Sequence, residues 1–448
     1  MNNPIWIMTS AFPKLTFRQV AAKAREIGAQ GMELCVFRRD GTRKDHVATH
    51  LPYERFSRDD AARLLDFLGK ARLRVSLGAY DNMIGGDPAE RVRNQNHILK
   101  LIRIAHLLGG DRNDVVVGTF VGYDNELGRT VGGFEKNLML YRKVFAPIVK
   151  YAEDLGVTLV YENCPMEGWQ PAAAPDTYNN LPCTLAARKL MYALVPSRAH
   201  GEIYDPSHDV WQHVDPSDVI EASDMRRIRR IHIKGTRNYE RDAASVHWGR
   251  LFPEQTVDPK LAKRAGVPIP ANEWDRHHYE PRVPGFGGSD SMDWSLFLET
   301  LMKRGFDGPF SIENEGCNSS HTGNMGATVQ GFQAAVLNTA PVVWPLGPKG
   351  YAFDESKLAP LAPAAAKDVP VVTMDALVSR RKSPPGVPRA RRRTRRARRF
   401  VPKRAAAAAG AAAARKLLLS IRSFPPLTGK ATRCSASNPS TSFSRSRR

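Results

Sequence analysis

The feature that most constrains the fold is a regular alternation of short apolar segments with longer amphipathic segments, between residues 5 and 316. Eight apolar runs have the length of β-strands, at residues 5–10, 31–37, 74–80, 114–120, 157–164, 201–205, 228–235 and 308–316. Segments with apolar residues every three or four positions predict helices at 16–28, 57–71, 87–109, 137–156 and 293–306. Eight strand-then-helix units predict a parallel sheet, and eight strands also close a (β/α)₈ barrel.

An open doubly wound sheet is the alternative arrangement of such units. In that fold a glycine-rich phosphate loop commonly follows the first strand, whereas here the first strand runs into "TSAFPKLTF". We therefore predict the α/β class and a (β/α)₈ TIM barrel. Two connections, residues 165–183 and 236–292, are longer than simple turns. Both follow the carboxyl ends of strands, where barrel enzymes carry their active sites, and loops of this length commonly bind ligands or cover a site.

The net charge of +21 is concentrated in the last part of the chain. Residues 351–448 hold 23 of the 66 Lys and Arg residues but only 4 of the 45 Asp and Glu residues, so the preceding part is nearly neutral. Beyond residue 345 the sequence is rich in Pro, Ala, Arg and Ser, a composition that buries too little apolar surface to fold alone. We expect a barrel domain at 1–345 and a disordered basic tail at 346–448.

The cysteines and the apolar segments indicate the compartment. The five cysteines are widely spaced and include no CxxC pair, which favours a reducing compartment over a disulfide framework. The amino-terminal segment lacks the basic and apolar regions of a secretory signal. No apolar run approaches the roughly 18–20 residues that span a bilayer. We therefore expect a soluble cytoplasmic protein without a membrane partner, and a homo-oligomer.

Side chains that can bind a metal ion fall near the ends of the last four predicted strands, one on each: Glu162, Asp205, His232 and Glu313. Alternate residues of a barrel strand point inward, so these side chains are expected to meet at the mouth of the barrel. Each alone has an ordinary explanation, such as a solvated strand end or a core histidine. Together, the buried carboxylates would repel one another unless a cation lay between them. The oxygen-rich set predicts one divalent ion, Mn²⁺, Mg²⁺, Co²⁺ or Zn²⁺.

Four sequence motifs surround these positions: "YENCP" (161–165), "YDPSHDVWQ" (204–212), "IHIKGTR" (231–237) and "DWSLFLETLMKRGFDGPFSIENEG" (293–316). A fifth, "GTFVGYD" (118–124), is weaker. None is specific alone, but as an ordered set they resemble the xylose isomerase-like barrels, the sugar phosphate isomerase/epimerase superfamily. The resemblance extends over residues 5–340.

The resemblance implies a role for each residue that matches a family motif. The family's four metal ligands correspond to Glu162, Asp205, His232 and Glu313. The two glutamates also correspond to its paired acid/base groups. His208, three residues after Asp205, corresponds to a histidine that contacts the substrate.

Two basic residues are expected beside the ligands. Arg237, five residues after His232, resembles the family's arginine that anchors substrate oxygens. Lys234 shares the strand parity of His232 and should face the pocket, where it either holds a substrate anion or pairs with an acidic ligand. The last ligand could be Glu315, which has the parity of Glu313, although "FSIE" favours Glu313.

Other polar residues near strand ends have two interpretations. Glu33 follows the second apolar run and is interpreted as a solvated turn acid in preference to a pocket residue. Glu167 is a loop acid or a group that supports a ligand, and His277–His278 belongs to the loop surface or to a lid over the substrate.

These observations predict a divalent-metal isomerase or epimerase for a sugar, a sugar phosphate or a polyol ketone. A metal ion stabilises an enediolate, and the paired glutamates move the proton. The alternative is a metal-dependent dehydratase of a keto-polyol such as inosose or dehydroshikimate, because enolisation begins both reactions. A DNA-repair endonuclease would need a trinuclear zinc cluster, for which the early strands offer too few ligands. More remotely, the arginine run at 389–399 could bind nucleic acid or other polyanions non-specifically.

Overall fold

The computed structural model describes residues 3–41, 49–166, 179–238, 259–267, 279–282, 284, 290–313, 358–365 and 368–379. The chain divides into two units, residues 1–389 and 390–448, and every described residue belongs to the first. Several sequence-based predictions therefore lie outside the described residues, namely those for Glu167, His277–His278, Glu315 and the arginine run.

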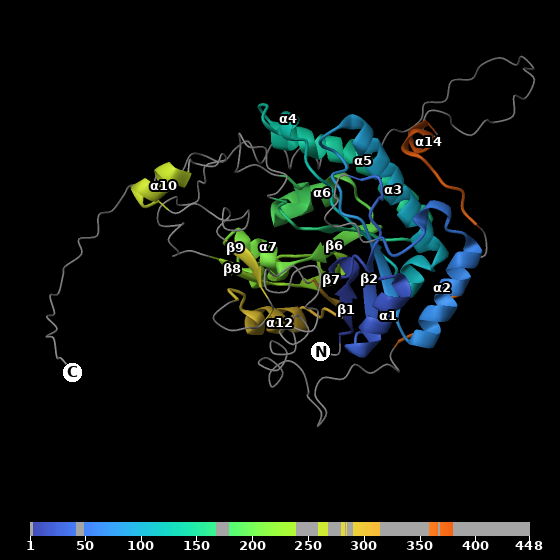
Figure 1. Ribbon diagram of the computed structural model, residues 1–448. Helices are drawn as coiled ribbons and strands as arrows, with labels where there is room; N and C mark the ends of the chain where they lie inside the picture. Colours follow the sequence, from blue (N-terminus) through green and yellow to red (C-terminus); the bar gives the residue numbers. More distant parts are fainter. Residues whose placement is uncertain are drawn as a thin grey trace, which may run out of the picture. The chain divides into compact units, whose positions relative to one another are not determined.

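Eight parallel strands close into a barrel, which confirms the predicted fold class (Figure 1). The strands are β1 (Ile5–Met8), β2 (Gly31–Cys35), β3 (Arg74–Gly78), β4 (Val117–Thr119), β5 (Leu159–Glu162), β6 (His200–Tyr204), β7 (Ile228–Ile233) and β10 (Phe310–Ile312). Each strand pairs with its neighbour in sequence, and β10 pairs with both β7 and β1. All eight predicted strands are present, although the apolar runs extend beyond the paired residues because the chain leaves the sheet into the site loops.

All five predicted helices are also present: α1 (Phe17–Glu26), α2 (Arg58–Ala71), α3 (Pro88–Leu107), α5 (Gly133–Asp154) and α12 (Trp294–Lys303). Shorter helices lie in the connections: α4 (Asn125–Gly128), α6 (Leu185–Leu194), α7 (Pro206–Trp211), α8 (Pro216–Glu221) and α10 (Pro259–Ala265). Part of the predicted long loop after β7 forms an antiparallel pair, β8 (Gly235–Asn238) with β9 (Tyr279–Arg282). No helix in the described part of the chain is both long enough and apolar enough to cross a membrane.

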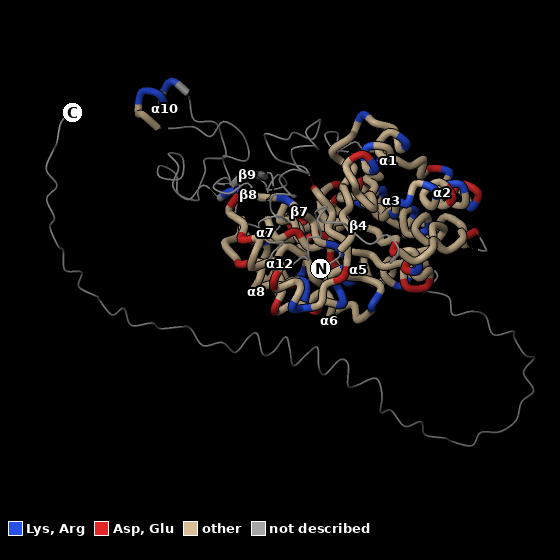
Figure 2. Tube along the Cα trace, turned by 90° about the horizontal axis from the view of Figure 1, so that it is seen from below, with Lys and Arg blue, Asp and Glu red and all other residues tan. Residues whose placement is uncertain are grey.

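Local sequence signals explain where the outer helices begin and end. Thr16 and Ser57 close capping boxes at the starts of α1 and α2, satisfying backbone N–H groups that have no partner within the helix. Gly109 ends α3 with a φ of 101°, a left-handed conformation that a side chain would strain. Basic and acidic residues lie side by side along α2, as in the Lys70–Asp66 pair at 2.7 Å, in keeping with a nearly neutral barrel (Figure 2).

The amino-terminal half of the barrel interior is filled by packed side chains. Trp6 of β1 lies across it, and the guanidinium of Arg230 from β7 stacks on the Trp6 ring at 4.4 Å from its centroid. A side chain at Gly31 would place its Cβ 2.3 Å from the Trp6 ring, so only glycine fits there. Arg230 is neutralised by Asp114 at 2.9 Å. Because this packing fills the amino-terminal half of the interior, the buried polar side chains described below lie in the carboxyl-terminal half.

Within the predicted tail, residues 358–365 and 368–379 are described by the structure and pack against the barrel. We call residues 358–365 and 368–379 the strap; it ends in α14 (Met374–Ser379), which packs against α3 and α5 (Figure 1). Arg103 of α3 donates to the Asp368 carboxylate and to the Val369 carbonyl. This Pro/Ala-rich segment contains a few apolar residues that anchor it, among them Val372 and Met374, which are buried. The division at 345 remains a prediction as a domain boundary.

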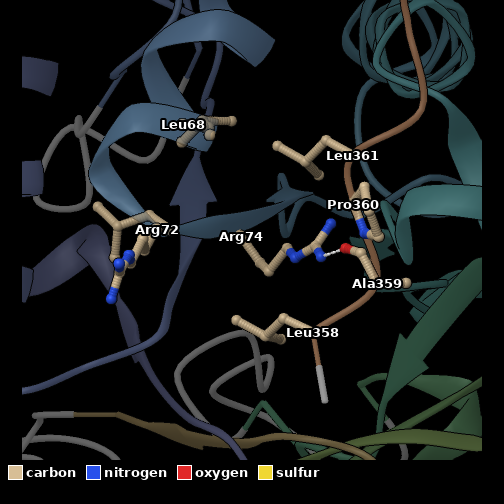
Figure 3. A pocket seen from close by; sticks show the side chains of 9 residues that line it. Leu68, Arg72, Arg74, Leu358, Ala359, Pro360 and Leu361 are labelled. Carbon is tan, nitrogen blue, oxygen red and sulfur yellow. Dashed lines mark hydrogen bonds between the residues drawn. The ribbon is translucent and has the colours of Figure 1, made fainter. Parts of the chain in front are cut away.

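The strap also encloses a cavity of about 490 Å³ against α2 and the start of β3 (Figure 3). Leu68 and Leu73 line one side, and Leu358 and Leu361 line the other. Arg74 spans the gap by donating a hydrogen bond to the Ala359 carbonyl. The strap is thus held by polar contacts at several points as well as by apolar packing.

Replacing Val372 by Ala should lower the free energy of unfolding by about 1.5 kcal/mol, because the substitution removes two buried methyl groups. Val371 is the matched control: it is 54% exposed, whereas Val372 is 6% exposed, so Val371→Ala should leave stability unchanged. Urea melts of both variants measure the difference. Equal stability of the two variants would contradict docking of the strap in solution.

Candidate metal centre

The four predicted ligands meet at the carboxyl-terminal end of the barrel. Glu162, Asp205, His232 and Glu313 each offer a ligand atom, and these atoms all lie within 4.8 Å of one another. All four side chains are buried, with relative exposures from 0 to 6%. The structure therefore brings together four side chains that strand order, parity and the surrounding motifs had predicted to meet.

The barrel register fixes where each of these residues lies. Glu162 is the last residue of β5, and Asp205 directly follows β6, where its Oδ1 accepts from the Ser207 N–H and caps α7. His232 lies opposite Ser311 in the β7–β10 ladder, and Glu313 comes just after β10. The Glu313 N–H donates to the Ile233 carbonyl at 3.1 Å, which continues the ladder by one residue. Parallel pairing thus sets the four side chains at one level.

Two asparagines hold the loop that follows β5. The Asn163 side chain forms two hydrogen bonds with the Asp205 backbone: its NH₂ group donates to the Asp205 carbonyl at 2.9 Å, and its oxygen accepts from the Asp205 N–H at 2.8 Å. Asn180 donates to the carbonyls of Glu162 at 3.0 Å and Cys164 at 2.8 Å. All these contacts are buried or partly buried, so they fix the backbone on both sides of Glu162. The sequence analysis did not assign a role to either asparagine.

His208 and Lys234 lie inside the cluster. Nε2 of His208 is 3.2 Å from Oε1 of Glu162 and 3.1 Å from Oδ2 of Asp205. Nζ of Lys234 is 2.9 Å from Oδ2 of Asp205 and 3.1 Å from Oε2 of Glu313. Lys234 thus pairs with acidic ligands, one of the two roles considered for it.

Arg237 is placed differently from the other predicted site residues. It lies on β8, opposite Glu280 of β9, and its side chain is exposed. The reason is that the chain leaves the barrel after Ile233 and continues into the antiparallel pair. The structure therefore puts Arg237 outside the buried cluster.

Glu33 was wrongly interpreted as a solvated turn acid. It lies inside the barrel on β2, is 1% exposed, and its Oε2 is 3.1 Å from Nε2 of His232. The Tyr80 hydroxyl donates to its other oxygen. A Cβ atom at Gly78 would lie 2.8 Å from the Tyr80 ring, and a Cβ atom at Gly118 would lie 2.5 Å from the Tyr80 hydroxyl oxygen. Side chains at either position would therefore collide with Tyr80. Glycine at both positions thus makes room for a tyrosine that supports Glu33.

Electrostatics couple this pair to the cluster. Burial alone would lower the pKa of His232, but the carboxylates of Glu33 and Glu313 raise it well above the ordinary value. Burial alone would likewise raise the pKa of Glu33, but His232 and the Tyr80 hydroxyl lower it. His232 therefore lies between two carboxylates, with Nε2 toward Glu33 and Nδ1 toward Glu313 at 3.2 Å.

The residues fit a divalent cation. Nδ1 of His232 and Oδ2 of Asp205 are buried and form no hydrogen bond of good geometry among the described residues. Both atoms face the shared cluster, where three carboxylates and one imidazole provide the hard O/N set that Mn²⁺, Mg²⁺, Co²⁺ or Zn²⁺ accepts. Such a cation would also offset the repulsion between the carboxylates.

The comparison with known families agrees with this arrangement. The family model described as the xylose isomerase-like TIM barrel matches residues 21–333, more than half of the chain. The chain belongs to the xylose isomerase-like TIM barrel family. A search of curated proteins finds no match.

Solved structures of similar fold include an L-ribulose 3-epimerase, at 15% identity and a TM-score of 0.48 over 76% of this chain and 95% of that chain. A probable 3-DHS dehydratase, AsbF of Bacillus anthracis, has 15% identity and a TM-score of 0.46, covering 75% and 98% of the two chains. The IOLI protein with a zinc atom has 13% identity and a TM-score of 0.49, covering 75% and 98%.

A second buried acid in this xylose isomerase-like barrel gives a pH prediction. Asp209 of α7 accepts a 2.6 Å hydrogen bond from Tyr204, and burial raises its pKa to about 6, against the lowering effects of Arg188 and Tyr204. The ordinary value is 3.8, so the folded protein holds the proton more tightly. The stability that this provides is present below pH 4 and is lost as the pH rises through 6.

We therefore expect the wild type to lose on the order of 3 kcal/mol more unfolding free energy than Asp209→Asn between pH 4 and pH 7. Urea melts at a series of pH values measure this. Parallel pH profiles for the two proteins would show that Asp209 does not titrate in this range.

Proposed function

We propose that the protein is a divalent-metal-dependent isomerase or epimerase acting on a sugar, a sugar phosphate or a polyol ketone. The observation that carries this proposal is the placement of two buried glutamates, Glu162 and Glu313, in one cluster with Asp205 and His232. A divalent ion, when bound by these four residues, would supply a positive charge that stabilises negative charge developing on a substrate carbonyl oxygen.

The two glutamates are assigned the proton transfer. Glu162 and Glu313 come from strands on different sides of His232, so their carboxylates can approach a substrate carbon from two directions. One, as a carboxylate, removes a proton from the carbon beside the carbonyl, and the other, in its protonated form, donates a proton to the same carbon or to the neighbouring carbonyl carbon. Positioned general bases of this kind contribute about 10²–10⁴-fold each. Return to the opposite face of the same carbon gives an epimer, and return to the neighbouring carbon gives an isomer.

Basic groups near the glutamates are assigned to the substrate. His208 lies within hydrogen-bond distance of Glu162, and its imidazole can donate to a substrate oxygen once the substrate enters. Lys234 carries a positive charge between Asp205 and Glu313, which stabilises an oxyanion nearby. Arg237, exposed on β8, is proposed to contact the remote oxygens of the substrate.

Product analysis tests the proposal. The full chain, loaded with Mn²⁺, is incubated with a panel of ketoses, inososes and hydroxypyruvate. Formation of an epimer or isomer without loss of water supports the proposal, whereas loss of water would replace it by the dehydratase alternative.

Removal of the metal gives a separate prediction. Excess EDTA should abolish turnover, because the carboxylates would then lack the cation that stabilises the developing charge. Adding Mn²⁺ back should restore it, and an incubation with EDTA already saturated by Mn²⁺ controls for the chelator itself. Full activity in excess EDTA would exclude the proposed metal dependence.

A further inference from the structure

A second group of possible metal ligands overlaps the first. Glu162, Cys164 and His208 each offer a ligand atom, and these atoms also lie within 4.8 Å of one another. Cys164 has no part in the proposed proton transfer. The group is a carboxylate, a thiol and an imidazole, which differs in chemistry from the oxygen-rich set around His232.

The three side chains are positioned by backbone and ring contacts. The Asn180 amide binds the carbonyls of both Glu162 and Cys164, so the two residues keep a fixed spacing. The Cys164 side chain is half-buried against the apolar cluster that includes Phe37, Tyr80 and Phe120. The ring of His208 packs edge-on against Trp211, with centroids 4.4 Å apart.

We propose that Glu162, Cys164 and His208 form a second metal site, which binds a thiophilic divalent ion such as Zn²⁺ or Cd²⁺. Thiolate, imidazole and carboxylate are the ligands that zinc takes in proteins, and three protein ligands leave one position open to water or substrate. The site shares Glu162 with the first centre. A carboxylate can bridge two ions, and paired ions in enzymes lie roughly 3.5–4 Å apart.

The charge of the surroundings favours a second cation. Glu33, Glu162, Asp205 and Glu313 are buried together, and Lys234 supplies one positive charge among them. One divalent ion therefore leaves the group with a net charge of about minus one if the carboxylates are ionised. A second divalent ion would offset this remaining negative charge.

Cys164 is better suited to this role than the other buried cysteines. Burial and the nearby Glu33 raise the pKa of the Cys35 thiol to about 12, so Cys35 stays protonated at neutral pH. Cys183 is buried on the short helix Leu181–Cys183. Cys164 alone among these three is half-buried, and its sulfur lies within 4.8 Å of ligand atoms of Glu162 and His208.

The second site has a consequence for turnover. An ion bound there would occupy His208, which is assigned to the substrate, and one oxygen of Glu162, which is assigned to proton transfer. Thiophilic ions should therefore inhibit an enzyme loaded with Mn²⁺. This consequence rests on the proposed function, whereas the binding itself does not.

Cadmium binding to the full chain tests the site without an activity assay. The protein is first saturated with Mn²⁺ and then titrated with Cd²⁺, while the ultraviolet cadmium–thiolate charge-transfer band is recorded. We expect this absorption band to reach its maximum at one Cd²⁺ per wild-type chain and to be absent in Cys164→Ser. The matched control Cys183→Ser should keep the band. His208→Gln should weaken Cd²⁺ binding at least about tenfold, because a ligand is lost.

Three results would overturn the site. A wild type without the band lacks the thiolate ligand. A band that persists in Cys164→Ser comes from another cysteine. Unchanged affinity in His208→Gln means that Cys164 binds the ion without the histidine. If Cys164→Ser fails to fold, alkylation of the wild type decides: Cd²⁺ should protect Cys164 from iodoacetamide, as measured by mass spectrometry, and equal labelling with and without Cd²⁺ would refute the proposal.

Discussion

Replacing Glu162 by Gln should lower kcat by about 10²–10⁴-fold, the usual contribution of a positioned general base. The glutamine amide keeps the shape of the glutamate side chain. It can still occupy the space beside His208, whose Nε2 lies 3.2 Å from Oε1 of Glu162. It cannot accept the substrate proton, and it removes one negative charge from the metal cluster. Turnover is measured at saturating Mn²⁺, together with bound metal per chain, so that weaker metal binding and loss of the base are told apart.

The matched control is Glu299→Gln on α12, a solvent-accessible glutamate paired with Lys303, which should leave kcat unchanged. A second comparison uses Glu313→Gln. If the two glutamates share one proton transfer, the double variant should lose little more than the worse single variant. A Glu162→Gln enzyme with bound metal and wild-type kcat would refute the role of Glu162 as a base.

The sequence predicted the barrel and the four clustered residues for a common physical reason. A parallel strand must be apolar to be buried, and strands of a closed barrel have one inward face, so position along a strand determines which side chains meet. Glu162 and Asp205 end their strands, and His232 lies between isoleucines on β7, so each could be placed by counting. A single sequence is sufficient for that step because parity is a local property of each strand.

The residues that support the cluster were harder to predict. Glu33 follows the same parity rule on β2 and could have been found by applying the rule to the early strands. Asn163 and Asn180 act through backbone contacts made only after the chain folds, and 16 residues separate Asn180 from the Cys164 carbonyl that it binds. The position of Arg237 outside the buried cluster could not be predicted, because nothing in "IHIKGTR" indicates that the chain leaves the barrel and forms an antiparallel pair.

The strap illustrates a different limit. Composition averaged over residues 346–448 is that of a disordered segment, and the average hides individual anchors. Val372 and Met374 are buried on the barrel, and the Met374 N–H donates to the Asn96 side chain at 2.8 Å. Binding of such a segment depends on a complementary surface on α3, which is encoded elsewhere in the sequence. Composition therefore describes whether a segment folds alone, and it says less about whether it docks.

The support of His232 by Glu33 leads to a second large effect. With Nε2–H donating to Glu33 at 3.1 Å, Nδ1 faces Glu313 and the other proposed ligands, and its lone pair would be available to a bound cation. A carboxylate in this position fixes the ring and the tautomer of a metal-binding histidine and makes it a stronger ligand. Glu33→Gln removes the charge while keeping the shape, so we expect Mn²⁺ affinity to fall about 10–100-fold.

Isothermal titration with Mn²⁺ measures this loss, and thermal melts of the metal-free variant show whether the fold is intact. Tyr80→Phe is the matched variant: it removes only the hydroxyl that donates to Glu33, and the ring can keep its packing against Phe120 at 5.1 Å. Since Tyr80 would act through Glu33, its effect should be smaller, and the double variant should bind Mn²⁺ no more weakly than Glu33→Gln alone. Wild-type affinity in a folded Glu33→Gln variant would show that the histidine needs no such support, whereas additive losses would indicate that Tyr80 acts on the metal centre independently.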